Sequence, residues 1–374
     1  MKTFKYRLKP SRSQRTKLNR TLEVCRWVFN ERLATRKNSW EQDKKNLSLY
    51  DTNKLLTLWK RDHPEWVSVH SQVLQNVQER VDLAFQAFFR RVKAGEKPGY
   101  PRFRGTGWYA SFTFKQSGFE LLENGWLISK IGAVRIIRHR PVEGRIKTLT
   151  VQRDAVGNGY ACCACEAEPA PMPFNELAIG IDVGLESFAT FSKGGHIDNP
   201  RFFRRAEKEL AKAQRLLSQA DKGTPERAKR RKAVQHVHPR IANRRKDFAH
   251  QKSRELVNRF GCMVFEDLHV KNMLQNHGLA KSISDAAGNQ LILYTTYKAE
   301  KAGRVVVLVD PRNTSKRCSG CGTLVEKSLS VRVHPCPVCG LVMDRDENAA
   351  NNILRLGLKS LGMALEAPAF RRGE

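Results

Sequence analysis

Long apolar runs and acidic residues are both scarce in this chain of 374 residues. No stretch approaches 18 consecutive apolar residues, so we expect no membrane-spanning helix. The first residues, MKTFKYRLKPSRSQRTK, lack the apolar core of a signal peptide, so we expect a cytoplasmic protein associated with the nucleoid. Only 37 residues are Asp or Glu against 67 Lys and Arg, a formal net charge of +30. This charge indicates a polyanionic partner: nucleic acid first, an acidic membrane surface as the weaker alternative.

Five of the nine cysteines show no ligand spacing. Cys25 and Cys262 stand alone among apolar residues, which is typical of buried thiols. Cys162, Cys163 and Cys165 lie in the strand-like run YACCACE, whose alternation puts the last two on one face. Strand packing is the favoured interpretation of these three, and a metal site is the alternative left open.

The remaining four cysteines form two C-x2-C pairs separated by 14 residues. In a reducing compartment such a quartet indicates metal binding rather than disulfides, and four thiolates suit a closed, structural Zn²⁺ site. A glycine follows the second cysteine of each pair, as a tight turn requires; two unrelated pairs would not explain that match. The predicted zinc ligands are Cys318, Cys321, Cys336 and Cys339.

The N-terminal half combines a strand, helices and then short strands. Residues 3–8 alternate like a strand, and apolar residues recur at helical spacing between positions 11 and 100. After position 101 the period changes to two, with turn residues between short runs. We expect a small antiparallel barrel or sheet that the first strand joins, with the helices inserted between strands. The proline-rich segment 169–175 is the predicted linker.

The C-terminal half predicts an α/β region with a strongly basic insertion. Segment 201–254 holds 18 Lys/Arg against 5 Asp/Glu in helix-forming sequence that is broken near Gly223. We expect a basic helical hairpin whose surface faces an anion, and a solvated helical pair is the alternative. Apolar strands, a helix over 282–302 and a last helix after the ribbon complete the region, and the tail 366–374 is expected to be loose.

Four carboxylates stand at the ends of predicted elements. Asp182 and Glu266 end apolar strands, while Asp344 and Asp346 begin the last helix. A charge at the end of a buried strand costs free energy unless it is paired or metal-bound, and converging carboxylates repel unless a cation lies between them. A single such Asp is more often a turn or cap residue. Together, on so basic a chain, they predict a two-Mg²⁺ site that hydrolyses a phosphodiester.

These residues carry a family resemblance. GIDVGL, FEDL, RNTSKRCSGCG, CPVCG and DRDENAANNI, in this order, resemble the RuvC-like nuclease of TnpB (OrfB) proteins from insertion sequences. YRLKPSRSQRTKLNRTLEVCRWVFN and KPGYPRF extend the resemblance over nearly the whole chain. It implies an RNase H-like fold and an RNA-guided DNA endonuclease related to type V CRISPR effectors. Carried over, the catalytic triad is Asp182, Glu266 and Asp346, the last because the family's acid lies two residues before Asn348.

The resemblance also implies a domain plan and partners. A wedge β-barrel would comprise 1–10 and 101–170, a helical recognition insertion 11–100, and the nuclease domain 176–374, with a zinc ribbon at 314–343. A guide RNA from the transposon end would be held, and double-stranded target DNA would be cut beside a short adjacent motif. A monomer is favoured. The residues expected to read the motif are Tyr50, Ser71, Gln72, Gln75, Asn76 and Thr113, with ordinary helix-surface polarity as the alternative for each.

Further residues and readings stay open. Arg312 and Lys316 either support catalysis at the scissile phosphate, as Asp344 would beside the triad, or are ordinary surface residues. Where the family usually has a Trp, this chain has Gly288, and the lost aromatic would loosen packing near the site. The alternatives to a nuclease are an inactive RNA-guided repressor and an accessory or tyrosine-type transposase. The intact triad argues against the first alternative, and no tyrosine lies in an HxH context to support the last.

Overall fold

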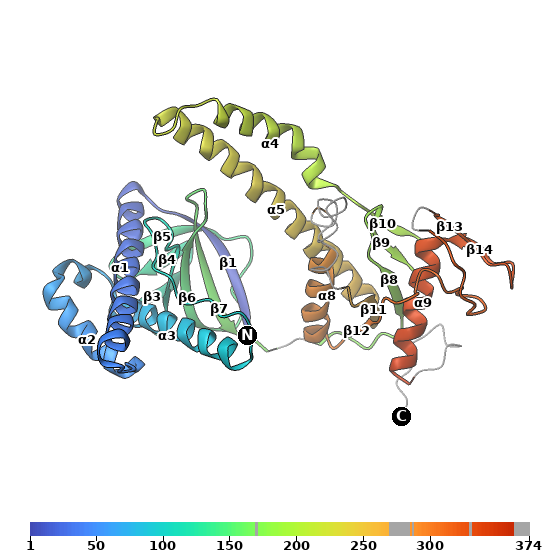
Figure 1. The fold of residues 1–374 in the computed structure, drawn as a ribbon, viewed down its shortest axis with the longest axis horizontal. Coiled ribbons are helices and arrows are strands. Elements are labelled where there is room, and N and C mark those ends of the chain that lie inside the picture. Colours follow the sequence, from blue (N-terminus) through green and yellow to red (C-terminus); the bar gives the residue numbers. More distant parts are fainter. Residues whose placement is uncertain (169–170, 269–284, 286–287, 329–330, 363–374) are drawn as a thin grey trace. The chain divides into compact units, whose positions relative to one another are not determined.

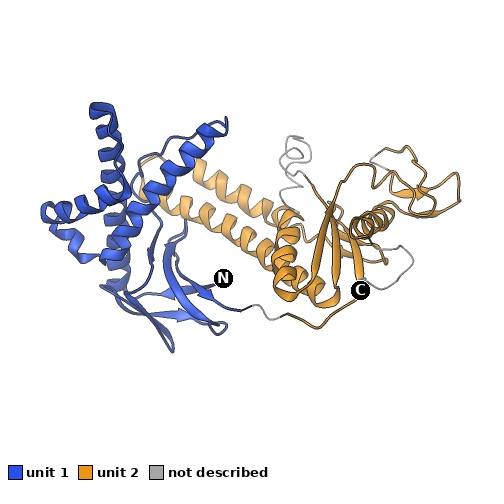
Figure 2. Cartoon of the chain, turned by 90° about the horizontal axis from the view of Figure 1, so that it is seen from below, with its two compact units in different colours: residues 1–168 blue, residues 169–374 orange. Residues whose placement is uncertain are grey.

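The computed structural model describes residues 1–168, 171–268, 285, 288–328 and 331–362 (Figure 1). The chain divides into two compact units, Met1–Glu168 and Pro169–Glu374 (Figure 2). The division falls where the proline-rich segment 169–175 begins. In the described parts, no helix has both the length and the apolar character to cross a membrane.

Unit 1 is built on one seven-stranded antiparallel sheet with the first strand near its middle. The strand order is β2-β6-β7-β1-β5-β4-β3. β1 pairs with β5 on one side and β7 on the other, so the N-terminal strand joins the sheet as expected. The sheet is curled, and no pairing between its edge strands β2 and β3 is found in the described residues, so closure into a barrel stays a prediction. The strands are β1 Lys2–Lys9, β2 Ser111–Phe114, β3 Phe119–Leu122, β4 Gly125–Ile128, β5 Gly132–Ile137, β6 Arg145–Arg153 and β7 Gly159–Glu166.

The helices of unit 1 all lie between β1 and β2 in the chain. They are α1 Arg12–Asp43, α2 Leu49–Asp62, a 3-10 turn η1 Pro64–Ser68 and α3 Ser71–Lys93. Ser11 and Gln14 form a capping box that starts α1 directly after the strand. Phe4 and Tyr6 of β1 share one buried core with Val28 of α1 and Val77 of α3. The helices are therefore packed on the sheet by apolar side chains that recur along α1 and α3.

Unit 2 contains a five-stranded mixed sheet of order β10-β9-β8-β11-β12. β8, β11 and β12 are parallel; β9 is antiparallel to β8, and β10 is antiparallel to β9. β8 and β11 are buried along almost their whole length, as strands covered on both faces must be. The strands are β8 Ala178–Asp182, β9 Ser187–Phe191, β10 His196–Asp198, β11 Cys262–Glu266 and β12 Val305–Val309.

Helices cover both faces of this sheet. On one face, α5 (Pro225–Arg259) and α8 (Gly288–Ala302) pack against Ile179, Met263 and Phe265. On the other face, α9 (Arg345–Ser360) packs Ile353 on Ala178 and Val264. Alternate residues of each strand thus face different helices, a pattern that fixes which way every side chain at the strand ends points.

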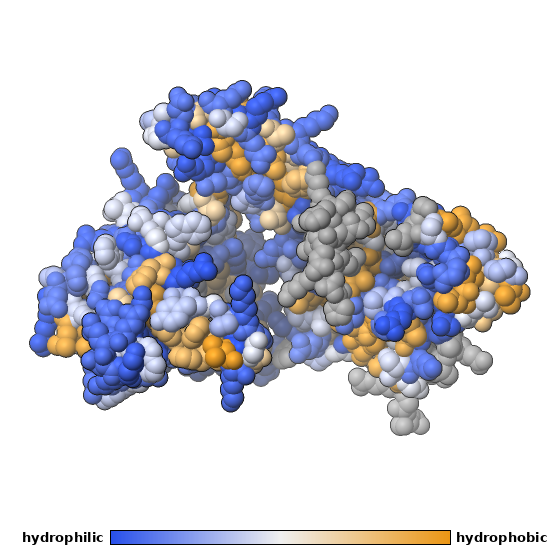
Figure 3. Space-filling model, viewed as in Figure 1, coloured by the Kyte–Doolittle hydropathy of each residue, from blue (hydrophilic) through white to orange (hydrophobic). Residues whose placement is uncertain are grey.

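The basic segment forms the predicted hairpin. α4 (Phe202–Ser218) lies against α5, and its apolar residues Ala206 and Leu210 meet Val237 and Ile241. In Figure 3, blue hydrophilic side chains cover much of this hairpin at the top of the view. Of the helix expected over 282–302, the structure describes Asp285 and α8. The tail 366–374 lies outside the described residues.

Candidate active site and metal centre

Asp182 and Glu266 end two neighbouring parallel strands. Ile181 of β8 is paired with Phe265 of β11, so the next residue of each strand is one of the two acids. Adjacent strand backbones lie about 4.8 Å apart, and residues in parallel register point to the same face. That face is the one covered by α9, because Gly180 and Val264, two residues earlier, both meet this helix. The two carboxylates therefore converge at one edge of the sheet.

Two glycines bring α9 close enough to present a third acid. A Cβ on Gly180 would lie 2.1 Å from the carbonyl oxygen of Ala350, and a Cβ on Gly357 would lie 2.5 Å from Val264. Helix and sheet thus meet backbone to backbone, one glycine coming from each element. Asp346 lies one helical turn before Ala350 and shares its side of α9. The helix consequently begins beside Asp182.

Asp344 and Asp346 have different surroundings. The Asp344 carboxylate caps α9 by accepting from the backbone N–H groups of Asp346 at 2.8 Å and Glu347 at 3.1 Å. Asp346 instead pairs with Arg345 at 3.1 Å and with Arg332 of the ribbon at 3.6 Å. Asp344 therefore fixes the helix start, and Asp346 offers its carboxylate to the site.

Burial sets the charge state of the two strand-end acids. The pKa of Asp182 is raised well above its ordinary value, first by burial and then by the negative charges of Glu266 and Asp346. Burial also raises the pKa of Glu266, while a 2.5 Å hydrogen bond from the Thr314 hydroxyl opposes the rise. Repelling, buried oxygen ligands of this kind suit a hard divalent cation such as Mg²⁺.

The acids are less tightly gathered than the cysteines. Over the described ranges, the Cys quartet is the one group of three or more potential ligands whose atoms all lie within 4.8 Å of one another. The carboxylate of Asp346 is paired with Arg345 and Arg332 instead. The structure thus places the three acids at one sheet edge, with Asp346 held by its arginine partners.

The cysteine quartet forms a compact cluster on the ribbon, whose hairpin is β13 (Val333–Pro335) and β14 (Val342–Asp344). The Sγ atoms of Cys318 and Cys339 are 3.6 Å apart, close to the edge of about 3.8 Å for a tetrahedron with Zn–S bonds of about 2.3 Å. Hydrogen bonds with Thr323 lower the pKa of Cys321 to about 6, whereas the pKa of Cys339 is raised to about 12 in the same cluster, so four thiolates there need a cation between them. The glycines after each pair, Gly322 and Gly340, both have positive φ. The predicted ligand set therefore fits zinc.

Two buried asparagines of α9 hold the chain that enters the ribbon. Asn348 donates to the carbonyl of Arg317 at 2.8 Å and accepts from the N–H of Ser319 at 2.9 Å. Asn352 donates to the carbonyl of Thr314 at 2.9 Å. This role was not predicted from the sequence, although the four-residue spacing of the two asparagines puts them on one helix face. The ribbon, Thr314 and Glu266 are thereby connected to the helix that carries Asp346.

The two expected support cations form no ion pair with the three acids in the described residues, whereas Asp344 caps the helix that carries Asp346. Lys316 pairs with Glu326 at 2.6 Å, and Arg312 is exposed with no ion pair to a carboxylate in the described residues. Arg332 and Arg345 are the cations at the site instead, and their pairing depends on the tertiary fold. A Cβ on Gly288 would lie 2.3 Å from Val183, so α8 packs closely beside Asp182 at the position where looser packing was expected.

Most of the residues expected to read the adjacent motif gather where α3 meets β2. Gln72 accepts hydrogen bonds from the backbone N–H groups of Gln116 and Ser117. Arg80 donates to the side chains of both Asn76, at 3.0 Å, and Thr113, at 2.8 Å. Ser71 accepts from Lys60 at 2.9 Å. The rest of the set stays exposed: Gln75 on α3, and Tyr50 on α2 with Lys54 over its ring.

Comparisons with known proteins agree along the chain. The OrfB_IS605 model, described as a probable transposase, matches residues 161–277; a Cas12f1-like TNB domain matches 289–353; and a helix-turn-helix model matches 1–45. Residues 1–45, which match the helix-turn-helix model, fold here as β1 and the single long helix α1. A solved Cas12f1–sgRNA–target DNA complex shares the fold with a TM-score of 0.56 at 13% identity, covering 90% of this chain and 82% of that one.

Two curated relatives extend over nearly the full length. A putative RNA-guided DNA endonuclease of Streptomyces pristinaespiralis is 37% identical over 96% of this chain and 89% of its own. The putative RNA-guided DNA endonuclease InsQ of Escherichia coli K12 is 30% identical over 96% of this chain and 92% of its own. The chain belongs to the TnpB (OrfB) family.

Proposed function

We propose that this protein is an RNA-guided, Mg²⁺-dependent DNA endonuclease of an insertion sequence that cuts beside a short transposon-adjacent motif. The observation that carries the proposal is the convergence of Asp182 and Glu266, in register on parallel strands, beside the start of α9 with Asp346. Relatives named RNA-guided DNA endonucleases over nearly the whole chain support the same activity.

The three acids share one role in this proposal. Asp182, on the strand between β9 and β11, would hold the metal together with Glu266 and Asp346. When bound, two Mg²⁺ ions activate a water and stabilise the leaving oxygen of the phosphodiester. Thr314 fixes the rotamer of Glu266 through its 2.5 Å hydrogen bond. Arg332 and Arg345 are the cations paired with Asp346, and they would balance the negative charge of a phosphate bound beside it.

The nucleic acids are held by charge and read by base pairing. The excess of 30 positive charges supports two polyanionic partners, a guide RNA and the DNA that it pairs with. Gln75 and Tyr50 present exposed side chains for the adjacent motif. Asn76 and Thr113 are fixed in the protein by Arg80 and contribute from the α3–β2 junction. The Cys quartet binds one structural Zn²⁺ that keeps the ribbon folded.

A plasmid cleavage assay tests the proposal. RNA that copurifies with the protein is sequenced to give the guide, and a supercoiled plasmid is built with the matching target beside a randomised flank. We expect Mg²⁺-dependent linearisation that Asp182→Ala reduces by about 1,000-fold, equivalent to about 4 kcal/mol of lost transition-state stabilisation. The matched control is Asp198→Asn, at an exposed carboxylate of β10.

Three outcomes contradict the proposal. Cleavage at the wild-type rate by the Asp182→Ala variant would show that the predicted triad does not catalyse the reaction. Guide-dependent binding by the wild type without cleavage would favour the RNA-guided repressor. A covalent DNA–protein adduct on a denaturing gel would favour a transposase that breaks and joins element ends.

A further inference from the structure

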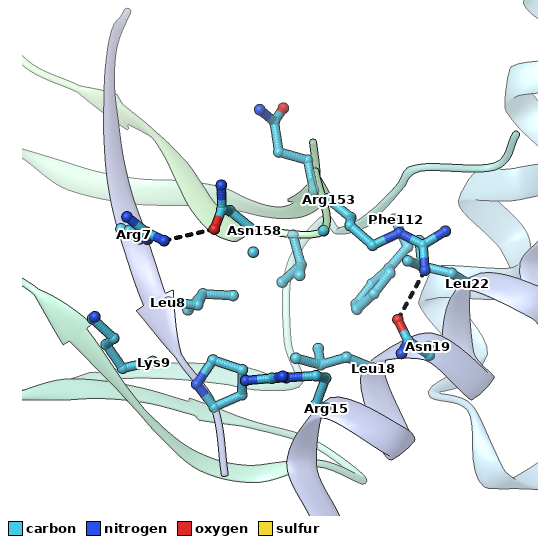
Figure 4. A pocket seen from close by; sticks show the side chains of 15 residues that line it. Arg7, Leu8, Lys9, Arg15, Leu18, Asn19, Leu22, Phe112, Arg153 and Asn158 are labelled. Carbon is cyan, nitrogen blue, oxygen red and sulfur yellow. Dashed lines mark hydrogen bonds between the residues drawn. The ribbon is translucent and has the colours of Figure 1, made fainter. Parts of the chain in front are cut away.

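Unit 1 contains a cavity of about 230 Å³ between the end of β1, the start of α1 and the hairpin that joins β6 to β7 (Figure 4). None of the residues described above for catalysis, zinc binding or motif reading lines it. Its volume lies below the range of about 300–1,000 Å³ that holds whole small-molecule ligands, so it suits a fragment of the size of one base. Its occupant must therefore be small or be one unit of a chain.

The floor of the cavity is apolar. Leu8, Leu18 and Phe112 line it and are almost fully buried. The wall beside them is kept open by Gly159, where a Cβ would lie 3.4 Å from Leu8. A flat apolar group can rest on such a floor, and a free inorganic anion gains nothing from it.

The rim is cationic. Arg7, Lys9, Arg15 and Arg153 line the cavity, and no acidic residue does. Arg7 donates to the side-chain oxygen of Asn158 at 2.6 Å, and Arg153 donates to that of Asn19 at 2.9 Å (Figure 4). Both bonds use neutral acceptors, so the two guanidinium groups are held in place without a direct ion pair to a carboxylate in the described residues.

The amide that holds Arg7 is itself oriented. Asn158 donates through Nδ2 to Asp154 at 2.9 Å, and its backbone N–H donates to the same carboxylate at 2.8 Å. These bonds turn the amide oxygen of Asn158 toward Arg7. Lys9 and Arg15 make no ion pair within the described part of the chain, so they are available to an anion. The rim is thus prepared before any ligand arrives.

We propose that this cavity binds one nucleotide of a nucleic-acid strand, with the base on the floor of Leu8, Leu18 and Phe112 and the phosphates at the arginines of the rim. An apolar floor under a ring of cations matches the two parts of a nucleotide, a flat base and its phosphates. The inference rests on the proposed function and adds a contact that the metal site and the motif residues do not supply. The guide RNA is the expected source of the nucleotide, and target DNA is the other source.

Binding of the full chain to two fluorescent 20-nucleotide probes tests the inference. The probes are single-stranded RNA and DNA of the same sequence, measured by anisotropy at one fixed salt concentration. We expect Arg15→Glu to weaken RNA binding about tenfold more than Arg20→Glu. Arg20 is an exposed control on the same helix outside the cavity, with the same charge change. Gly159→Val narrows the cavity without changing charge, and a several-fold loss is expected.

The outcomes separate the two sources and the two proposals. A larger effect on the RNA probe assigns the nucleotide to RNA, and a larger effect on the DNA probe assigns it to DNA. Equal losses for Arg15→Glu and Arg20→Glu, or unchanged binding by a folded Gly159→Val, overturn the cavity assignment. If the wild type cuts plasmid while those losses are equal, only the cavity assignment fails. If the wild type cuts nothing while the Arg15 effect persists, only the proposed function fails.

Discussion

At the scale of single residues, the metal-free site is a source of instability. Burial, together with Glu266 and Asp346, raises the pKa of Asp182, and burial raises the pKa of Glu266. Acids whose folded-state pKa exceeds the unfolded value contribute stability below the unfolded pKa, at about pH 4. That contribution is lost as the pH rises through the folded-state values. Binding of a proton or a cation there therefore stabilises the folded protein.

This linkage predicts the pH dependence of stability. In magnesium-free buffer, Asp182→Asn should raise the melting temperature relative to wild type, and the gain should grow as the pH rises from about 4 to 8. Thermal unfolding at several pH values measures it, with the exposed Asp198→Asn as control. A gain that is the same at every pH would contradict the burial argument. Added Mg²⁺ should stabilise the wild type and not the Asp182 variant.

The Thr314 hydroxyl gives a second prediction at this scale. Because its hydrogen bond lowers the pKa of Glu266, Thr314→Val should raise that pKa and move the acidic limb of the cleavage pH profile upward. Thr314→Ser keeps the hydroxyl and should restore the wild-type profile. The profile of guide-dependent cleavage is the measurement, and a Val variant that only lowers the rate at every pH would count against this role.

Residues at element ends could be predicted, whereas their partners could not. Asp182 and Glu266 follow apolar runs, so the sequence predicts their place at the ends of buried strands. Thr314 lies 48 residues after Glu266 in the sequence, and their hydrogen bond depends on how the ribbon packs on the sheet. The same reason hides Arg332, whose pairing with Asp346 needs the folded ribbon. Local spacing carries no information about either pair.

At the scale of elements, the approach of α9 to the sheet is the critical contact. Gly180→Ala would place a methyl group 2.1 Å from the Ala350 carbonyl, so the helix must move away from β8. We expect destabilisation of about 1–3 kcal/mol and a loss of cleavage larger than that stability change explains. Gly99→Ala, where the nearest atom is 3.8 Å away, is the matched control.

Melting temperature and cleavage are measured together for both glycine variants. If a stable Gly180→Ala protein cleaves DNA at the wild-type rate, the position of α9 does not control Asp346.

Removal of zinc tests the ribbon as an element. The Cys321→Ser variant should lose the metal, and its zinc content by elemental analysis should fall from about one ion per chain to about none. Because Asn348 and Asn352 tie the ribbon entrance to α9, cleavage should fall as well. Cys162→Ser, at a cysteine outside the cluster, is the control. Zinc retained by the Cys321 variant would refute the four-thiolate site.

The elements differ in how far the sequence determined them. The capping box at Ser11, the basic hairpin and the strand ladder of unit 1 follow local patterns and could be predicted. Closure of the curled sheet could not, because it depends on whether β2 and β3 meet, and no local pattern specifies that pairing. The asparagine contacts of α9 were equally hidden, since their partners are carbonyl groups of a loop.

At the scale of the whole molecule, the charge predicts steep salt dependence. With 67 cationic and 37 acidic residues, binding of the guide should release many counterions. We expect the affinity for RNA to fall by about 10³–10⁵ between 50 and 200 mM salt, the loss seen for six to ten phosphate contacts. Filter binding over a salt series measures the slope, and a slope near zero would contradict electrostatic capture.

The boundary between the two units could be predicted from the sequence, because the period-two strands give way to a proline-rich segment at one place. The family resemblance added the activity, which composition alone leaves at the level of a polyanion partner.

The central position of β1 has a consequence during synthesis. β1 leaves the ribosome before the other strands of this sheet, and its partners β5 and β7 follow about 130–160 positions later. At about 5–20 residues per second, the first strand waits roughly 8–30 s before its neighbours emerge. A nascent chain of this length stays exposed to chaperones and to misassembly. Trimming the first nine residues would cut the sheet into two halves, β2-β6-β7 and β5-β4-β3, rather than remove an edge.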